Sequence, residues 1–141
     1  MSPHNLLQEQ QVGKPDEVWR ILVVCSLLNR THGRGVRLMV DKIFERWPNP
    51  KAMAECDRDE LAALIKPLGF SKRRSSQLRQ MSIDLGQGLP VFACCGCGPY
   101  AVASVKIFVQ GMTVPTDDQW LGKYLEWRSN QPGVQGRVRA V

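Results

Sequence analysis

The chain has 141 residues, of which 43% are hydrophobic and 23% are charged, a composition that fits one globular domain with its own core. Its formal charge of +6 favours partners that carry negative charge, nucleic acid before an anionic membrane. The longest apolar run, Ile21 to Leu28, is far shorter than the ~20 residues that cross a bilayer. Residues Met1 to Gln11 lack the basic and apolar regions of a secretory signal, so we expect an intracellular protein without membrane contact.

Helix-breaking residues divide the first part of the chain into short predicted helices. A proline followed by two acids at 15–17 is a good helix start, and segment 18–28 is apolar on nearly every side, as in a central helix of a bundle. Gly33 and Gly35 are expected to end this helix. A second helix with one apolar stripe is then expected over 36–46. Two prolines then end that helix.

The middle of the chain has equally distinct helix boundaries. Asp57 and Glu60 form a capping box for a third helix, which a proline and a glycine stop at 67–69. Ser71 is the expected cap of a fourth helix, which ends at the glycine-rich turn 86–88.

The last part of the chain completes an all-helical order. A helix is expected from Pro99 to about Gln110, then an extended link over 112–116 and a final helix over 117–128. Little of the sequence alternates with a period of two residues, so the predicted fold class is all-α, a compact helical bundle. We expect one domain over 1–128 and a polar, loosely held tail over 129–141.

Five cysteines are an odd number for a disulfide framework in a reducing compartment. The cluster of Cys94, Cys95 and Cys97 contains no CxxC pair, and His4 and His32 lie far from it in sequence. We therefore favour small thiols buried as modest hydrophobes over a metal site.

The segment Leu89 to Tyr100 carries the first sign of chemistry. Two short helices joined by Gly96, Cys97 and Gly98 form a hairpin whose glycines allow a tight turn and a close approach to a ligand. Pro99 suits the first position of the second helix, whose unpaired N–H groups can bind a phosphate oxygen. An ordinary turn between two helices has the same pattern.

A second sign lies at the start of the final helix. Thr116 and Gln119 form a capping box, and the acids Asp117 and Asp118 between them suit the positive end of the helix dipole. The same placement keeps a carboxylate ionised at neutral pH, as a catalytic anion requires. Local sequence alone leaves both interpretations open.

A basic helix face offers contacts to phosphate groups. Lys72, Arg73 and Arg74, with Arg79, fit a surface that positions DNA and makes its binding sensitive to salt. A solvated helix face has the same composition.

From Ser2 to Trp127 the chain resembles the helix-hairpin-helix (HhH-GPD) DNA glycosylase superfamily. It is most similar to the mismatch-specific thymine glycosylase domain that accompanies methyl-CpG-binding domains. Five motifs in the family's order carry the resemblance: Ser2-Pro3-His4-Asn5-Leu6-Leu7-Gln8-Glu9, Leu27-Leu28-Asn29-Arg30-Thr31, Lys66-Pro67-Leu68-Gly69-Phe70, Gly96-Cys97-Gly98-Pro99-Tyr100, and Asp118 with Leu121, Tyr124 and Trp127.

The resemblance implies a catalytic group and a base pocket. Asp118 matches the family's catalytic aspartate. Asp117 is a secondary candidate, because the link before it is one residue longer than in the relatives. Tyr100 would line the pocket for the extruded base, and Gln8 would contact that base's polar edge.

The resemblance also implies contacts with the rest of the DNA. Arg30 would fill the gap left in the duplex, and Leu68 would form a wedge against the opposite strand. Gly96 and Gly98 of the hairpin would grip a phosphate, an arrangement compatible with a monovalent cation on the hairpin carbonyls.

Several positions depart from related enzymes. Pro99 replaces a usual lysine, and Cys94 and Cys95 replace apolar residues before the hairpin. Bifunctional relatives carry a Schiff-base lysine where this chain has Tyr100, so hydrolysis without a lyase step is expected. Because no cysteine follows Cys97, the iron–sulfur cluster of many relatives is not expected.

The resemblance thus implies a monofunctional DNA glycosylase that excises thymine or uracil mispaired with guanine in base excision repair. Such an enzyme would act on duplex DNA as a monomer without a cofactor, in the nucleus of a eukaryote or the cytoplasm or nucleoid of a bacterium or virus. Three alternatives remain. The substrate is another base, such as an alkylated purine or adenine opposite oxidised guanine; the chain is a catalytically inactive DNA-binding module; or it is a structural bundle with accidental motifs.

Overall fold

The structure, a computed structural model, describes residues 2–29, 31 and 33–132. The regular elements of these residues are all helical, which confirms the predicted all-α class. Arg30 and the tail beyond residue 132 lie outside the described residues. No helix in the described part has the length and apolar character needed to span a bilayer. The elements are α1 (Leu7–Gln11), α2 (Glu17–Leu28), α3 (Gly33–Arg46), α4 (Pro50–Ala54), α5 (Arg58–Ile65), η1 (Lys66–Leu68), α6 (Ser71–Gly86), η2 (Val91–Ala93), α7 (Pro99–Phe108) and α8 (Gln119–Ser129).

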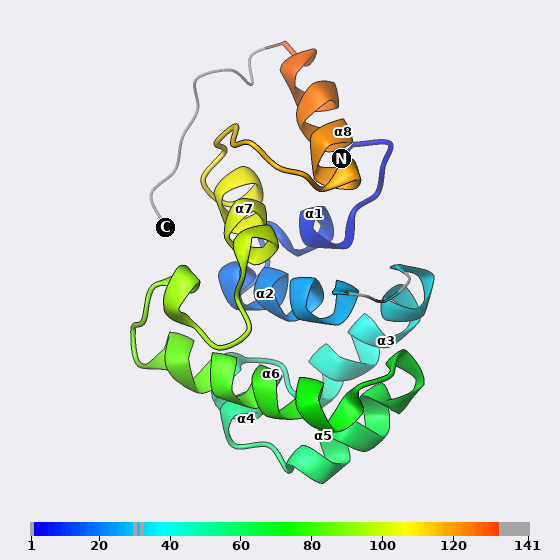
Figure 1. Cartoon of the computed structure of the whole chain (residues 1–141), viewed down its shortest axis with the longest axis vertical. Helices are drawn as coiled ribbons and strands as arrows, with labels where there is room; N and C mark the ends of the chain where they lie inside the picture. Colours follow the sequence, from blue (N-terminus) through cyan, green and yellow to red (C-terminus); the bar gives the residue numbers. More distant parts are fainter. Residues whose placement is uncertain (1, 30, 32, 133–141) are drawn as a thin grey trace.

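The helix α2 is the central element of the fold (Figure 1). Its side chains are buried on almost every side, and it contacts α1, α3, α6 and α7. Figure 1 shows α1, α7 and α8 on one side of α2 and α3 to α6 on the other. A helix without a polar face is stable only when it is surrounded in this way, so its predicted central position is confirmed.

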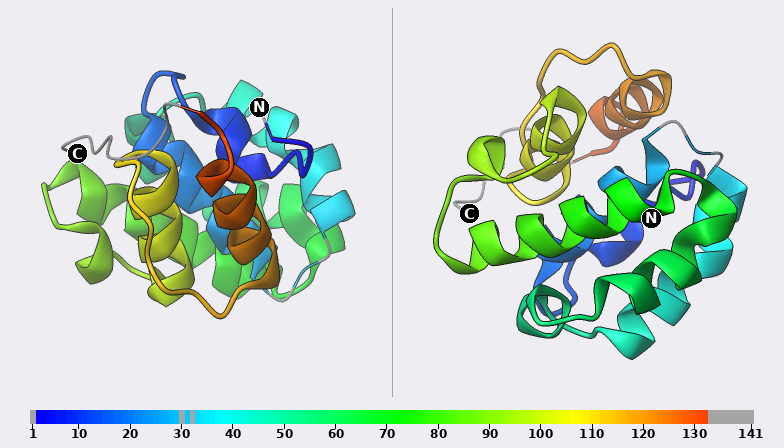
Figure 2. Two further views of the ribbon diagram at one scale, coloured as in Figure 1. Left: turned by 90° about the horizontal axis from the view of Figure 1, so that it is seen from above. Right: turned by 60° about the horizontal axis from the view of Figure 1, so that its bottom comes forward.

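The second group of helices packs around α6. Figure 2 shows α4 and α5 alongside α6, in agreement with their contacts. The buried indole of Trp19 in α2 donates a hydrogen bond of 2.9 Å to the hydroxyl of Ser82 in α6. The same indole meets the ring of Phe44 in α3 edge-on, with centroids 5.3 Å apart. Trp19 therefore connects α2 to α6 and to α3.

The helix α2 ends before α3 begins, as predicted, but it ends at Leu28, so the predicted position of the break at Gly33 and Gly35 is wrong. The helix α3 begins at Gly33 and continues through Gly35 to Arg46. A Cβ atom at Gly35 would lie 3.3 Å from Cδ2 of Leu68, which is tighter than most such contacts. The glycine at this position therefore permits close packing of η1 on α3 and does not end the helix.

The structure corrects the predicted cap at Ser71 and one half of the capping box predicted between Asp57 and Glu60. Phe70 precedes α6 with a left-handed φ of 50°, and Ser71 is the first helical residue, so the predicted cap at Ser71 is wrong. The cap at Asp57 is confirmed, because its carboxylate accepts N–H groups of the first turn of α5. The carboxylate of Glu60 does not close the capping box, since it pairs with Arg46 at 2.6 Å.

Two helices of five residues, α1 and α4, are not predicted by the sequence pattern. The helix α4 has a local signal, because the side chain of Asn49 accepts a 2.8 Å hydrogen bond from Ala52 N and Pro50 occupies the first turn. The helix α1 has no side-chain cap. Its position depends on packing against α2 and α7.

Candidate active site

The hairpin between η2 and α7 depends on a glycine with a left-handed backbone. Gly96 has a φ of +74°, which side chains adopt only with strain. The carboxylate of Asp84 accepts a 2.9 Å hydrogen bond from Cys95 N and so ties the hairpin to α6. Gly98 is the N-cap of α7 and supplies no side-chain acceptor to that helix. The element before the turn is one 3₁₀ turn, shorter than the predicted helix. A monovalent cation on the hairpin stays a prediction.

The two hairpin glycines are expected to differ when each is replaced by alanine. Gly96→Ala should lower the free energy of unfolding by ~1–2 kcal/mol, because alanine is strained in the left-handed region. Gly98→Ala should lower it by less, ~0.5 kcal/mol, because its φ is −93°, an added Cβ would meet nothing within 4 Å, and the only cost is that alanine is a poorer N-cap than glycine. Urea denaturation of both variants tests this difference, and equal losses would contradict it.

The cysteines are free thiols, and Cys25, Cys56 and Cys94 are buried, as expected for small hydrophobes. Cys95 and Cys97 are half-buried. Burial raises the pKa of Cys25 and of Cys97 to about 12, so both thiols are protonated at neutral pH. Within the described residues, no group of three His, Cys, Asp or Glu side chains could hold a metal ion.

A cavity of about 920 Å³ lies where the two groups of helices meet. It is formed by the N-terminal segment and by the adjoining ends of α2, α3, α7 and α8. Gln8, Tyr100 and Asp118, which the sequence predicts to act together, all line it. In the described part of the chain, the residues that line it are His4, Leu6, Leu7, Gln8, Leu28, Asn29, Thr31, Gly33, Arg34, Arg37, Tyr100, Asp118 and Trp120.

Gln8, which is buried, and Tyr100, which is half-buried, form a polar pair in this cavity. The amide nitrogen of Gln8 donates a 2.6 Å hydrogen bond to the Tyr100 hydroxyl and a weaker one of 3.5 Å to Ser104. Gln8 is 1% exposed, so these bonds fix its amide. Burial raises the pKa of Tyr100, and the nearby Cys25 and Asp118 add to the effect. Tyr100 is therefore a neutral phenol that keeps its own proton at neutral pH.

Asp118 is the N-cap of α8 and also borders the cavity. Its Oδ2 accepts a 2.9 Å hydrogen bond from Leu121 N, and the Thr116 hydroxyl accepts one of 3.1 Å from Asp118 N. The capping box predicted between Thr116 and Gln119 is therefore wrong, because Asp118 is the cap. The helix N-terminus stabilises negative charge at this position. Asp117 is exposed and does not line the cavity.

Arg128 fixes α8 relative to α7. Its buried guanidinium donates to the carbonyl oxygens of Ile107 at 2.9 Å and Met112 at 2.6 Å, and to the Thr113 hydroxyl at 3.2 Å. The rings of Phe108 and Tyr124 pack beside this contact, with centroids 4.6 Å apart. These contacts anchor the last turn of α8, the helix that Asp118 caps at its other end.

The other predicted DNA contacts have different surroundings. Leu68 is half-buried against the core, and its role as a wedge stays a prediction. Lys72 and Arg73 are exposed on the first turn of α6, as a phosphate contact requires. Arg74 is 6% exposed and donates to the carbonyl oxygens of Leu27 and Asn29 at the end of α2, so its assignment to the phosphate surface is wrong.

Sequence reasoning missed two arginines on the rim of the cavity. Arg34 and Arg37 are exposed on the first turns of α3 and line the cavity. Their spacing of three residues, which puts them on one helix face, was the available signal. Arg37 also donates a 2.7 Å hydrogen bond to the Asn5 carbonyl oxygen, which connects α3 to the N-terminal segment.

Sequence reasoning also missed Trp120, whose indole lines the cavity with 51% of its surface exposed. No local pattern distinguishes this tryptophan from the others, because its exposure follows from the way α8 sits on the rest of the fold.

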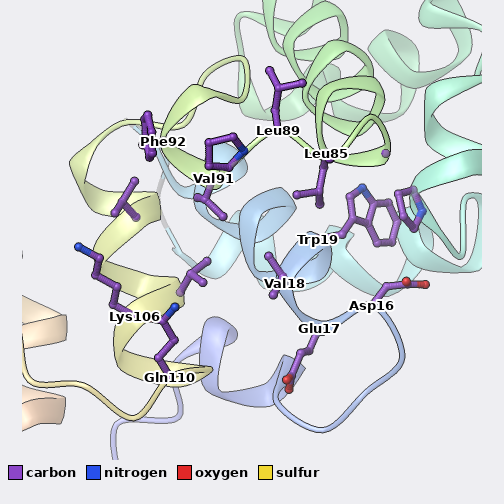
Figure 3. Close-up of a pocket in the computed structure, with 16 residues that line it drawn as sticks. Asp16, Glu17, Val18, Trp19, Leu85, Leu89, Val91, Phe92, Lys106 and Gln110 are labelled. Carbon is purple, nitrogen blue, oxygen red and sulfur yellow. The ribbon is translucent and has the colours of Figure 1, made fainter. Parts of the chain in front are cut away.

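A second hollow, of about 700 Å³, lies at the opposite ends of α2 and α7 (Figure 3). Figure 3 shows Lys106 and Gln110 on one side of it, Asp16 and Glu17 near the start of α2 on another, and apolar side chains between them. The length of α2 separates the two hollows by ~15 Å. Among the described residues, none that the sequence assigns to chemistry lines the second hollow.

Comparison with curated proteins gives one plant relative named for a methyl-CpG-binding domain and two archaeal relatives named as DNA glycosylases. The chain is 35% identical over 130 residues to a methyl-CpG-binding domain protein 4-like protein of Arabidopsis thaliana, a match that covers 89% of this chain and 28% of the relative. It is 31% identical over 117 residues to a thymine-DNA glycosylase of Aeropyrum pernix, covering 77% of this chain and 52% of that protein. It is 26% identical over 122 residues to a thymine/uracil-DNA glycosylase of Pyrobaculum aerophilum, covering 80% of this chain and 53% of that protein. The chain thus spans about half the length of the two archaeal relatives.

The fold and the family agree with these relatives. A solved structure of a thermostable thymine-DNA glycosylase superposes with a TM-score of 0.61 and 25% identity, over 64% of this chain and 46% of that one. Residues 24–134, which include the hairpin and Asp118, match the family described as HhH-GPD superfamily base excision DNA repair protein. The chain therefore belongs to the HhH-GPD superfamily of base excision DNA repair proteins, as its ordered motifs predict.

Proposed function

We propose that the chain is a monofunctional DNA glycosylase that hydrolyses the N-glycosidic bond of thymine or uracil mispaired with guanine. The observation that carries this proposal is the convergence of Gln8, Tyr100 and Asp118 in one cavity, although they come from three separate parts of the chain. The names of the two archaeal relatives, a thymine-DNA glycosylase and a thymine/uracil-DNA glycosylase, support the same class of substrate. The proposed activity takes place in the compartment that contains the cell's DNA.

Asp118 is the proposed catalytic group. Cleavage of the N-glycosidic bond develops positive charge on the sugar, and a carboxylate about 4 Å away stabilises it by ~4 kcal/mol at an effective dielectric constant of ~20. Because Oδ2 accepts the N–H of Leu121, Oδ1 is the atom available to the sugar or to the attacking water. A carboxylate that holds this water can also accept its proton.

Tyr100 and Gln8 are the proposed readers of the extruded base. Thymine and uracil each present two carbonyl oxygens and one ring N–H. The Tyr100 hydroxyl already accepts a hydrogen bond from Gln8, so its own proton is free to bind a carbonyl oxygen of the base. This arrangement favours a pyrimidine with carbonyl groups over a base with only amino donors at the same edge.

The cavity lining supports simple hydrolysis. A lyase step requires an amine that attacks the sugar, and none of the described residues that line the cavity is a lysine. Lys106 of α7 borders the second hollow instead. Water is therefore the proposed nucleophile, and an abasic site in an intact strand is the proposed product.

The rim arginines are the proposed phosphate contacts. Arg34→Gln and Arg37→Gln should each weaken binding to any duplex and lower the slope of log affinity against log salt by ~1. Lys51→Gln is the matched control, because Lys51 is exposed on α4, away from the cavity. Fluorescence anisotropy at several salt concentrations measures the slope. An equal change in the Lys51 variant would mean that general charge, not the rim, binds DNA.

A panel of duplexes tests the proposal. The chain is incubated with duplexes containing G·T, G·U, an alkylated purine opposite its normal partner, or adenine opposite oxidised guanine, and each product is analysed with and without alkali. We expect strand cleavage only at G·T and G·U, and only after alkali. Cleavage without alkali would contradict the monofunctional assignment, and activity confined to the other two duplexes would contradict the proposed substrate. Binding without an abasic product from any duplex would mean that the chain is a catalytically inactive DNA-binding module.

A further inference from the structure

An exposed aromatic ring stands at the mouth of the cavity. Trp120 lies in the first turn of α8, two residues after Asp118, and the two side chains line the same cavity. Its exposed fraction is 51%, whereas Trp19, Trp47 and Trp127 are buried or half-buried. An indole with this much uncovered surface beside polar reaction groups has the chemistry of a stacking platform.

Two neighbouring side chains contact the indole of Trp120 and restrict it before any ligand binds. The ring of His4 meets it edge-on, with centroids 6.3 Å apart and an interplanar angle of 62°. The ammonium group of Lys123 lies 4.6 Å from its centroid. A ring fixed by its neighbours loses little conformational freedom when a ligand covers it, which favours binding.

We propose that the base turned out of the duplex stacks on the indole of Trp120, which thereby covers that base at the mouth of the cavity. This inference rests on the proposed function. Bases inside a duplex are covered on both faces, so only an extruded base offers a free face to a protein ring. Tyr100 and Gln8 bind the edge of the base, whereas an indole binds its face, so the two sets of contacts act together.

Substitutions of Trp120 test the proposal, in a chain that also carries Asp118→Asn to prevent turnover. Trp120→Ala should weaken binding to a G·T duplex ~10-fold, the usual size of a base–aromatic stack. The same variant should bind a duplex with a tetrahydrofuran abasic analogue opposite guanine within ~2-fold of the parent, because that site has no base to stack. Trp120→Phe should recover most of the affinity for G·T, whereas Trp120→Leu, apolar but not aromatic, should not.

Tryptophan fluorescence supplies a readout that needs no change at Trp120. The G·T duplex should quench the tryptophan fluorescence of the Asp118→Asn chain. The abasic-analogue duplex and a fully paired duplex should quench this fluorescence much less. Phe92→Leu is the matched control, because Phe92 is 74% exposed but borders the second hollow. This variant should retain both the quenching and the affinity.

The outcomes separate the two proposals. Equal quenching by G·T and abasic-analogue duplexes, or equal loss of affinity for both in Trp120→Ala, would overturn the stacking proposal and indicate a contact with the DNA backbone. Base-dependent quenching by a chain that excises nothing from the duplex panel would overturn the proposed reaction but not the stack.

Discussion

Asp118→Asn is expected to lower the single-turnover rate of base excision by ~10²–10⁴-fold, because it removes the charge that stabilises the developing sugar cation. Asparagine caps helices about as well as aspartate, so the hydrogen bond to Leu121 N and the position of α8 should persist. Circular dichroism and the affinity for a G·T duplex should therefore stay close to those of the parent chain. The substitution separates the charge of Asp118 from its role as a cap.

Asp117→Asn is the matched control for this prediction. Asp117 precedes Asp118 in the same link but is exposed and outside the cavity lining. Its variant should retain excision within ~3-fold of the parent, a change of well under 1 kcal/mol in activation free energy. Loss of excision in Asp117→Asn with full activity in Asp118→Asn would show that the catalytic register is shifted by one residue.

Arg128→Met should lower the free energy of unfolding by ~2–4 kcal/mol, the largest stability loss expected outside the apolar core. Methionine keeps much of the apolar side-chain volume but leaves the buried carbonyl oxygens of Ile107 and Met112 without their donor. One of these carbonyls belongs to the last turn of α7, where the helix itself provides no partner. Urea denaturation measures the loss, and Arg73→Met, at an exposed arginine, should show almost none.

The same variant tests whether Arg128 positions the catalytic group. At a temperature where Arg128→Met is fully folded, its excision rate should still fall at least ~10-fold, because α8 is no longer fixed against the end of α7. Its affinity for paired DNA should change little, since Arg128 does not line the cavity. A folded variant with the parental excision rate would limit Arg128 to a purely structural role.

The fold was predictable where the signal lies within a few consecutive residues. The uniform apolarity of α2 indicated its central position, and the cap at Asp57 and the turn at Gly96 have local causes. Gly35 misleads as a helix breaker because its reason is a distant contact with Leu68. The burial of Arg74 likewise depends on a distant contact. Its partner Asn29, at the end of α2, lies 45 residues earlier in the sequence.

The site was predictable only through the complete set of motifs. A glutamine, a tyrosine and an aspartate, at 8, 100 and 118, share no local pattern, and only the fold brings them into one cavity. At Asp118 the position of a cap and the position predicted for a functional carboxylate coincide, since the residue caps α8 and also borders the cavity. Trp120 and the rim arginines were missed because exposure at a cavity mouth is a property of tertiary structure.

The most direct test of the central claim is the release of free base by the 141-residue chain itself. The chain in excess is mixed with a G·T duplex, and mass spectrometry follows free thymine while the strand is examined without alkali. The convergence of Gln8, Tyr100 and Asp118 predicts about one thymine per duplex and an intact abasic strand. A folded chain that binds this duplex and releases no base would contradict the account.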